Sequence, residues 1–491
     1  MRNITAEEPL QTDHWPLLLA DASKPAGIIT VTSPFDGSPV AAVETCGVLH
    51  IEQALATAHR CFRDRDRWLP LSERAGILER TARIMTKEHS SLALQAAREG
   101  GKPLADSLIE VTRAIDTVRL AIDELRTQVG EVIPMGLSAS SHGRLAFTTK
   151  QPIGVVVAVS AFNHPLNLVV HQVAAAIAAG CPVIVKPAED TPLSCLTFLQ
   201  MAHRAGLPVE WAQAIVTDDI AVAEKLVTDP RVGFFSFIGS ARVGWLLRSR
   251  LAPGTRCALE HGGVAPVLLA PDADFELALQ AILKGGFYHA GQVCVSVQRI
   301  FVPAARATEF AEALADKARK LKVGDPTDSE TEVGPLIRPR EAARIHSWVN
   351  EAVAEGAICL CGGAPLSESL YQCTVLLNPP ATARVSCEEI FGPVVCVYAY
   401  HDLDDAVERA NALPVAFQAA VFTRDIDVAL RAYHHLDASA VMVNDHTAFR
   451  TDGMPFAGLR QSGLGVGGVG HSIADMQIEK MLVINSVESR Q

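Results

Sequence analysis

The chain has 491 residues, enough for two or three domains that each bury a core. Acidic residues outnumber basic ones by 55 to 43, which gives a formal charge of −12 and no electrostatic basis for binding nucleic acid. The apolar stretch at 15–20 is too short to span a membrane, and the first residues lack the features of a secretory signal. We therefore expect neither a nucleic-acid nor a membrane partner.

The 11 cysteines are an odd number spread over a long chain. Disulfide-rich secreted domains are short and dense in cysteine, so we expect reduced thiols and a cytoplasmic protein. Cys359 and Cys361 are the closest pair, but they lack nearby histidine or cysteine partners, so we predict no metal site. Most of the thiols should be buried apolar groups.

Residues 49–127 show a helical pattern, with apolar side chains three and four positions apart. Gly130, Pro134 and Gly136 interrupt it, and residues 144–150 have the character of a strand. From Gly154 onward, short apolar runs typical of strands occur at 154–160, 182–186, 214–217, 234–238 and 266–269. An apolar helical segment at 171–179 separates the first two runs. This alternation indicates βαβ units in a buried parallel sheet, which binds ligands at the carboxyl ends of its strands.

The alternation resumes after Gly285, with a strand predicted at 297–302 and helices at 308–321 and 342–355. A second α/β domain is therefore expected. Residues 477–487 alternate as an edge strand would.

Cys294 follows Gly291 in a segment that Gly285 and Gly286 precede. Glycines allow tight turns and close approach of the backbone to a ligand, so this thiol is a candidate nucleophile. Taken alone, an inert buried cysteine is the commoner alternative.

Glu260 ends a short apolar strand and is followed, one residue later, by two glycines. A carboxylate facing a cleft there can act as a general base, although a surface carboxylate at a turn is the ordinary alternative. Asn163 follows the strand at 154–160 and can donate a hydrogen bond to an oxyanion. An asparagine in a turn before a helix is its ordinary alternative.

Lys186 ends the next strand, and Glu189 follows it by three positions, so both can bind ribose hydroxyls. Gly239 and Ser240 follow another strand and open a helix, whose free N–H groups suit a pyrophosphate. This motif differs from G-x-G-x-x-G and is a weak signal by itself.

Together these segments resemble the aldehyde dehydrogenase family over nearly the whole chain. Their order and separations match those of the family in Phe162-Asn163-x-Pro165, Lys186-Pro187-Ala188-Glu189, Gly239-Ser240 with Gly244, Glu260-x-Gly262-Gly263, Gly291-Gln292-x-Cys294, Glu388-Glu389-Ile390-Phe391-Gly392-Pro393, and Pro455-Phe456-x-Gly458 with Ser462-Gly463.

The resemblance implies that Cys294 is the nucleophile and Glu260 the general base. Asn163 and the backbone N–H of Cys294 would form the oxyanion hole. Two positions depart from the family, because His261 replaces its usual leucine and Val264 its usual lysine beside the base. These departures either perturb the base or repack the turn, and repacking is the preferred interpretation.

The resemblance also implies a nicotinamide cofactor. Lys186 and Glu189 would hold its adenosine ribose, and the Gly239-Ser240 turn its pyrophosphate. Glu389 would bind the nicotinamide ribose, with Phe391 beside the ring. Because the carboxylate of Glu189 repels a 2′-phosphate, NAD is the expected cofactor, with NADP possible.

The fold implied by the resemblance is α/β, with a Rossmann-like cofactor domain, an α/β catalytic domain and a small β oligomerisation arm. The cofactor domain would comprise 1–133 and 151–261, and the catalytic domain 262–471. The arm would comprise 134–150 and 472–491 and exchange between subunits, so a homodimer or homotetramer is expected.

A helix that starts near Asn163 would place His164, Leu168 and His171 on one face, which lines the substrate tunnel in the family. Val293 and Val295 flank the nucleophile, so the immediate aldehyde slot should be aliphatic.

By the same resemblance, Arg113 lies on a helix beside the tunnel and Arg450 on the loop above its mouth. Two histidines and two arginines favour a small polar or anionic aldehyde as substrate, although an ordinary solvated arginine is an equal alternative at both positions. The segments 292–299 and 444–458 resemble the lactaldehyde-related and phosphonoacetaldehyde-related branches most. Val293 stands where phosphonate-binding branches have an arginine, which disfavours a phosphonate.

Two rival functions remain open. A CoA-acylating aldehyde dehydrogenase would pass the acyl group to CoA, but relatives of that type usually lack the base that Glu260 supplies. A non-catalytic protein that kept the fold is the other rival. Retention of Asn163, Glu260 and Cys294 argues against it, although motifs alone do not prove activity.

Overall fold

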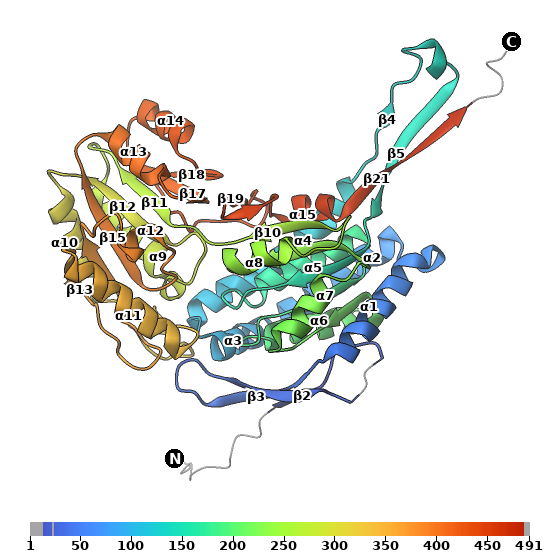
Figure 1. Cartoon of the computed structure of the whole chain (residues 1–491), viewed down its shortest axis with the longest axis horizontal. Helices are drawn as coiled ribbons and strands as arrows, with labels where there is room; N and C mark the ends of the chain where they lie inside the picture. Colours follow the sequence, from blue (N-terminus) through green and yellow to red (C-terminus); the bar gives the residue numbers. More distant parts are fainter. Residues whose placement is uncertain (1–12, 22–23, 486–491) are drawn as a thin grey trace, which may run out of the picture.

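The computed structural model describes residues 13–21 and 24–485 of the chain. Two large sheets lie next to each other, and a narrow β arm projects beyond them (Figure 1). A small N-terminal sheet has the strand order β1-β3-β2 and consists of β1 (Asp13–Trp15), β2 (Gly27–Thr32) and β3 (Pro39–Thr45). The helical region predicted at 49–127 forms α1 (Val48–Arg63), α2 (Leu71–Lys87), α3 (His89–Gly100) and α4 (Leu104–Thr127).

The first large sheet has six strands in the order β20-β10-β9-β6-β7-β8, and all but β20 run parallel. Its strands are β6 (Val155–Val159), β7 (Val183–Lys186), β8 (Ala212–Ala214), β9 (Val232–Ile238), β10 (Arg256–Glu260) and β20 (Gly463–Leu464). The helices of this region are α5 (Asn167–Ala179), α6 (Leu193–Arg204), α7 (Ile220–Val227), α8 (Ala241–Arg248) and α15 (Val469–Asp475).

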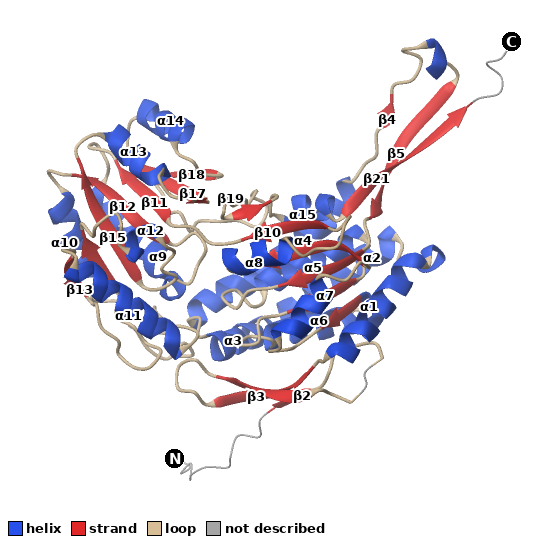
Figure 2. Ribbon diagram, viewed as in Figure 1, coloured by secondary structure: helices blue, strands red, loops and turns tan. Residues whose placement is uncertain are grey.

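Strand β6 shows why this sheet needs apolar residues on both faces. Val156 and Ala158 belong to the core that includes α2, α4, α5 and α6, whereas Val155 and Val157 belong to the core that includes α1 and α7. Helices lie on both sides of this sheet (Figure 2). Because successive residues of a strand point to opposite faces, a strand buried on both faces is a continuous apolar run in the sequence.

The second large sheet has seven strands in the order β13-β14-β15-β12-β11-β17-β18. Its strands are β11 (Ala265–Leu269), β12 (Val297–Pro303), β13 (Ile358–Cys361), β14 (Thr374–Leu377), β15 (Val394–Tyr400), β17 (Gln418–Phe422) and β18 (Ala440–Val443). Helices α9 (Phe275–Phe287), α10 (Ala307–Ala318), α11 (Pro339–Ala354), α12 (Arg384–Cys387), α13 (Leu403–Asn411) and α14 (Ile426–His435) accompany it. A two-stranded sheet of β16 (Val415–Ala416) and β19 (Leu459–Arg460) lies nearby along the chain.

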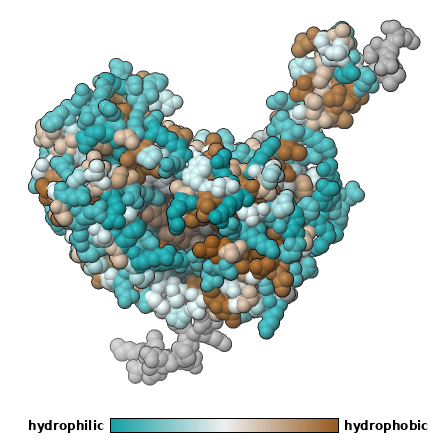
Figure 3. Space-filling view, in the orientation of Figure 1, coloured by the Kyte–Doolittle hydropathy of each residue, from teal (hydrophilic) through white to brown (hydrophobic). Residues whose placement is uncertain are grey.

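The arm is a three-stranded sheet in the order β21-β5-β4. It consists of β4 (Val132–Ile133), β5 (Arg144–Pro152) and β21 (Gln477–Asn485). The strand predicted at 477–487 is therefore present up to Asn485, and its last two residues lie outside the described residues. Figure 3 shows brown, apolar surface on the arm. The exposed apolar side chains of the arm include Val132, Leu137, Leu145, Met481, Leu482, Val483 and Ile484. Within the described residues, none of the helices combines the length and apolar character that a membrane crossing requires.

Two sequence predictions differ from the structure. The helix expected near Asn163 begins at Asn167, because the buried carboxylate of Glu110 accepts hydrogen bonds from the N–H groups of Leu166 and Asn167, both at 3.0 Å. The strand expected at 214–217 is β8 at Ala212–Ala214, because its ladder follows the short partner strand β7.

Candidate active site

Five of the predicted site residues lie at one edge of the six-stranded sheet. Lys186 and Glu260 end β7 and β10, Asn163 follows β6, and Gly239 and Ser240 follow β9. The strands are parallel, so their carboxyl ends meet at the same edge, where open α/β sheets bind ligands.

Cys294 lies on a loop whose backbone is held in an uncommon conformation. His289, Ala290 and Gly291 have φ values of 47°, 54° and 71°, three successive residues in the left-handed region. Side chains other than glycine rarely adopt this region, so the surrounding structure must stabilise the turn. A Cβ on Gly291 would lie 2.1 Å from the carbonyl oxygen of Gly392, so this position requires glycine.

The neighbouring Gln292 connects this loop to two other segments. Its Nε2 donates to the carbonyl oxygen of Pro335 at 3.1 Å, and its Oε1 accepts from the N–H of Ile337 at 3.0 Å. Its backbone carbonyl accepts a hydrogen bond of 2.9 Å from Asn163 Nδ2. These bonds bring Asn163 to the loop that carries Cys294.

Cys294 and Glu260 face each other, with 3.8 Å between Sγ and Oε1. Burial raises the pKa of Glu260, and the positive charge of Arg450 partly opposes this rise. Burial and the charge of Glu260 raise the pKa of the Cys294 thiol well above its ordinary value. A hydrogen bond of 3.1 Å from the N–H of Gly263 to the carbonyl oxygen of Cys294 joins the two loops.

Arg450 lies beside this pair and has no ion-pair partner within residues 13–21 and 24–485. Its guanidinium stacks 3.7 Å from the ring centroid of Phe456, and its buried Nε has no hydrogen-bond partner among the described residues. Arg450 lines a small cavity of about 50 Å³ with Glu260, Leu168 and His171. Burial lowers the pKa of the Arg450 guanidinium.

Arg113 is engaged differently, in a bidentate ion pair with Asp452. Asp452 also accepts hydrogen bonds from His171 Nε2 at 2.8 Å and from Asn167 Nδ2 at 3.1 Å. Burial lowers the pKa of His171, and the hydrogen bond to Asp452 opposes this effect. No local sequence signal marks Asp452 as a site residue, because its partner Arg113 is 339 positions away.

His164 is not brought to the cavity that Leu168 and His171 line. It precedes α5, and its Nε2 lies 3.3 Å from the hydroxyl of Tyr288. Burial and the nearby charge of Lys102 hold the pKa of His164 well below its ordinary value, so its ring is neutral.

The residues that flank the nucleophile are apolar and buried, as the sequence predicts. Val293 and Val295 form a small cluster with Phe417 and Phe456, against which Cys294 packs. The walls next to the thiol are therefore aliphatic and aromatic.

The predicted cofactor residues fit a dinucleotide in several respects. Lys186 Nζ and Glu189 Oε2 lie 3.6 Å apart. Ser240 is the N-cap of α8 and makes no capping bond from its side chain, so the N–H groups of the first turn remain available to an anion. His261 Nδ1 forms a 2.8 Å hydrogen bond to the carbonyl oxygen of Gly239, which supports the repacking interpretation of this residue.

Glu389 and Phe391 are the other two residues predicted to bind the cofactor. The buried Oε1 of Glu389 has no hydrogen-bond partner among the described residues, and burial raises the pKa of this carboxyl to about 8. A Cβ on Gly262 would lie 1.7 Å from that oxygen, so the glycine makes room for the carboxylate. The ring of Phe391 packs edge-to-face against Phe162 at 5.9 Å.

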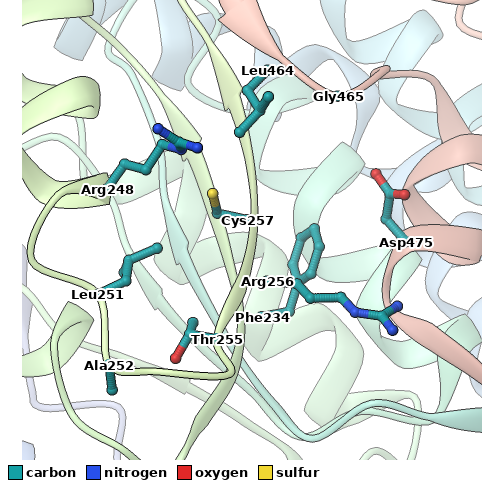
Figure 4. Close-up of a pocket in the computed structure, with 10 residues that line it drawn as sticks. All are labelled: Phe234, Arg248, Leu251, Ala252, Thr255, Arg256, Cys257, Leu464, Gly465 and Asp475. Carbon is teal, nitrogen blue, oxygen red and sulfur yellow. The ribbon is translucent and has the colours of Figure 1, made fainter.

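A larger cavity, of about 670 Å³, lies away from these residues (Figure 4). Arg248, Arg256 and Cys257 line it near the start of β10, together with Asp475 near the base of the arm. It shares Leu464 and Gly465 with the small cavity that Glu260 and Arg450 line.

The sequence model of the aldehyde dehydrogenase family matches residues 20–482. The chain belongs to this family. It is an oxidoreductase that acts on aldehydes and uses NAD(P). The resemblance found in the sequence is thus confirmed, as is its α/β fold class.

Three similar proteins are informative. A 3-sulfolactaldehyde dehydrogenase of Priestia aryabhattai is 36% identical over 455 residues, covering 93% of this chain and 94% of the relative. The structure of aldehyde dehydrogenase 21 from Physcomitrella patens with the reaction product succinate has a TM-score of 0.93 and 34% identity, covering 98% of this chain and 100% of that one. The NADP complex of the glyceraldehyde-3-phosphate dehydrogenase GapN from Methanocaldococcus jannaschii has a TM-score of 0.89 and 32% identity, covering 93% and 99%.

Proposed function

We propose that this enzyme oxidises a small polar or anionic aldehyde to the carboxylic acid through a thioester on Cys294, with water as the acyl acceptor. The observation that carries this proposal is the unpaired guanidinium of Arg450 beside Glu260 and Cys294. A buried cation without a carboxylate partner suits an anionic or strongly polar substituent of the substrate.

The relatives support this substrate class. One relative is a dehydrogenase of 3-sulfolactaldehyde, which carries a sulfonate, and the product bound to the Physcomitrella patens enzyme is succinate, a dicarboxylate. The residue before Cys294 is Val293 and not an arginine, so it cannot bind an anionic substrate. Arg113 and His171 bind Asp452, so we assign Arg450 as the cation that binds the substrate.

Cys294 adds as a thiolate to the carbonyl carbon of the aldehyde. The thiol loses its proton to solvent before it adds; burial and the charge of Glu260 raise its pKa, and the positive charge of Arg450 lowers it. The new oxyanion accepts hydrogen bonds from the backbone N–H of Cys294 and from Asn163, whose Nδ2 carries a second hydrogen beside the one given to Gln292.

The nicotinamide ring, when bound, supplies the hydride acceptor. Cys294 remains attached to the acyl carbon as a thioester once the hydride has left. Glu260 then removes a proton from water, which attacks the thioester and releases the acid and the thiolate. The raised pKa of Glu260 makes it a better base than an exposed glutamate.

We assign the cofactor to the residues that fit it. Lys186 and Glu189 hold the adenosine ribose, and the Gly239-Ser240 turn at the start of α8 holds the pyrophosphate. The unpartnered oxygen of Glu389 accepts from a hydroxyl of the nicotinamide ribose, with Phe391 beside the ring.

We also propose a cofactor domain of residues 1–133 and 151–261, a catalytic domain of 262–471, and an arm of 134–150 and 472–491 that exchanges between subunits of a homodimer or homotetramer. The exposed apolar side chains of the arm support a subunit contact there. All 11 cysteines are free, which agrees with a cytoplasmic location.

The test is reduced-cofactor production by purified protein across an aldehyde panel, with NAD or NADP and with or without CoA. The panel contrasts lactaldehyde, succinate semialdehyde and phosphonoacetaldehyde with neutral aliphatic and aromatic aldehydes, and Cys294→Ala serves as the blank. CoA-independent turnover of a polar or anionic aldehyde, lost in the blank, is expected. A strict requirement for CoA would instead indicate the acylating reaction, and activity that survives in the blank would refute the nucleophile.

A further inference from the structure

Lys102 and Glu110 form a buried ion pair next to the segment that follows Asn163. Lys102 lies in the turn between α3 and α4, Glu110 lies on α4, and both side chains are 0% exposed. Lys102 Nζ donates a hydrogen bond to Glu110 Oε2. The other oxygen of Glu110, Oε1, accepts from the N–H groups of Leu166 and Asn167 at 3.0 Å each. The ion pair thus fixes the backbone shortly after Asn163.

The side chain of Asn163 has a second contact, to the loop of the nucleophile. Its Nδ2 donates to the backbone carbonyl of Gln292 at 2.9 Å, and Gln292 shortly precedes Cys294 in the chain. Gln292 is fixed in turn, because its Nε2 donates to the carbonyl oxygen of Pro335 at 3.1 Å. Asn163 is therefore held through its amide by the loop of Cys294, and through the backbone that follows it by Glu110.

The turn that contains Lys102 contacts the segment to which Gln292 is bonded. A Cβ on Gly334 would lie 2.0 Å from the carbonyl oxygen of Gly101, so the two backbones are in close contact. Gly334 directly precedes the residue whose carbonyl oxygen accepts the hydrogen bond from Gln292. The ion pair, this turn and the loop of the nucleophile therefore form one connected ring of contacts that includes Asn163.

The ion pair is held in one arrangement, because its charges have no access to solvent. Burial lowers the pKa of Lys102, and the charge of Glu110 opposes this effect. A buried charge is costly unless a partner of opposite sign and hydrogen bonds compensate it. Any other arrangement would leave a buried charge, or the N–H groups at the start of α5, without a partner. The start of α5, and with it the loop of Asn163, is therefore held in a fixed position.

We propose that Lys102 and Glu110 are positioning residues, which hold Asn163 where its side-chain amide meets the oxyanion formed at Cys294. A donor stabilises an oxyanion only when it is already aimed at the place where the charge develops. A misplacement of about 1 Å, caused far from the chemistry, can cost roughly a hundredfold in rate. The inference rests on the proposed role of Asn163 in the oxyanion hole.

A helix cap that only stabilises the fold is the simpler role for Glu110, and Glu99 provides a matched comparison. This buried carboxylate accepts from the N–H groups of Leu193 at 2.7 Å and Ser194 at 2.8 Å, at the start of α6. Helix α6 follows β7 and not the loop of Asn163, so Glu99 has the capping role alone. Burial raises the pKa of Glu99 to about 7, so an assay at pH 8 keeps this carboxylate mostly ionised.

The experiment is a double-mutant cycle between Glu110→Gln and Asn163→Ala, with kcat measured on the purified full chain at pH 8. The cofactor and the best aldehyde of the panel are saturating. We expect Glu110→Gln to lower kcat about tenfold when Asn163 is present and less than about twofold in the Asn163→Ala background. KM for the aldehyde and the dissociation constant of NAD should change less than about threefold, because Glu110 acts on the transition state through Asn163.

Glu99→Gln is the matched control. It should lower the free energy of unfolding about as much as Glu110→Gln does, and change kcat less than about twofold. Should Glu110→Gln fail to fold, the variant Lys102→Met/Glu110→Gln removes both buried charges at similar volume and takes its place in the cycle. A loss of kcat that is equal in both backgrounds, or absent from both, would overturn the inference. So would an equal loss of kcat in Glu99→Gln.

Failure of the proposed oxyanion hole has a separate signature. If Asn163→Ala by itself leaves kcat within about twofold, the oxyanion role of Asn163 is rejected, and the positioning role falls with it. If Asn163→Ala lowers kcat and Glu110→Gln causes the same loss in both backgrounds, the oxyanion role stands and only the positioning role of the ion pair is rejected.

Discussion

Arg113 and Asp452 form a bidentate ion pair in the substrate region, with Nε–Oδ2 and Nη2–Oδ1 distances of 3.0 and 2.9 Å. Burial opposes the charge of Asp452, but hydrogen bonds from His171 and Arg113 hold its pKa well below the ordinary value. Two of the cationic candidates in the sequence are thus directed at an internal carboxylate. Arg450 is left to meet the substrate.

The first prediction distinguishes Arg450 from Arg113 by the effect of each on KM for anionic and for neutral aldehydes. Arg450→Gln should raise KM for anionic aldehydes about tenfold or more and leave KM for neutral aldehydes within about threefold, because it removes an unpaired cation. Steady-state kinetics on matched anionic and neutral aldehydes measure this.

Arg113→Gln is the control for this prediction. It leaves Asp452, whose side chain is 3% exposed, without its ion-pair partner, so it should lower the free energy of unfolding by about 3 kcal/mol. Its effect on KM should be the same for both classes of aldehyde. A selective loss of anionic substrates in this variant would transfer the anion site from Arg450 to Arg113.

The sequence predicts the alternating elements, because apolar periodicity carries that information, and its local motifs single out three residues for the catalytic site. It places Asn163, Glu260 and Cys294 at strand ends and loops that the fold brings together. It does not reveal Asp452, because its ion-pair partner Arg113 is 339 positions away in the chain. The sequence also predicts too early a start for α5, because the distant carboxylate of Glu110 accepts the hydrogen bond that caps this helix.

The second prediction concerns the general base. Glu260→Gln should let the thioester form and then persist, because an amide cannot take the proton from water. We expect a burst of reduced cofactor near one equivalent per subunit, followed by turnover slowed roughly 10²- to 10⁴-fold. Mass spectrometry of quenched protein should find the acyl adduct, which Cys294→Ala should lack. Unslowed steady-state turnover would exclude Glu260 as the base.

The third prediction follows from the charge of Arg450. That charge lowers the pKa values of Glu260 and Cys294, both of which burial raises, so its removal lets both rise further. The base must be deprotonated to act, so the acidic limb of kcat against pH should move upward by about one unit in Arg450→Gln. A neutral aldehyde should be used, so that substrate binding does not alter the profile. An unchanged limb, or a downward shift, would contradict the electrostatic coupling.

The fourth prediction links Glu389 to stability. Burial raises its pKa from 4.5 to about 8, so between these values the unfolded chain releases a proton that the folded chain retains. The free energy of unfolding therefore falls as pH rises through this window, by about 1.4 kcal/mol for each full unit of difference. Glu389→Gln should stabilise the protein at pH 8 by about 4 kcal/mol and have little effect near pH 4.5.

Thermal unfolding at the two pH values measures this effect, and the same variant should bind NAD more weakly because Glu389 is assigned to the nicotinamide ribose. A stability change of equal size at both pH values would mean that the ionisation of Glu389 is not its source.

The fifth prediction tests the arm. Leu482 is half-exposed on β21, which pairs with β5 on one side, so its apolar surface is expected to be covered by a second subunit. Leu482→Glu places a charge in that contact and should reduce the mass measured by light scattering to that of one chain, without loss of secondary structure. Lys480→Gln is the control, because it lies two positions earlier on the same face of the strand and should leave the assembly intact. An unchanged mass in Leu482→Glu would show that subunits, if they associate, do so away from this strand.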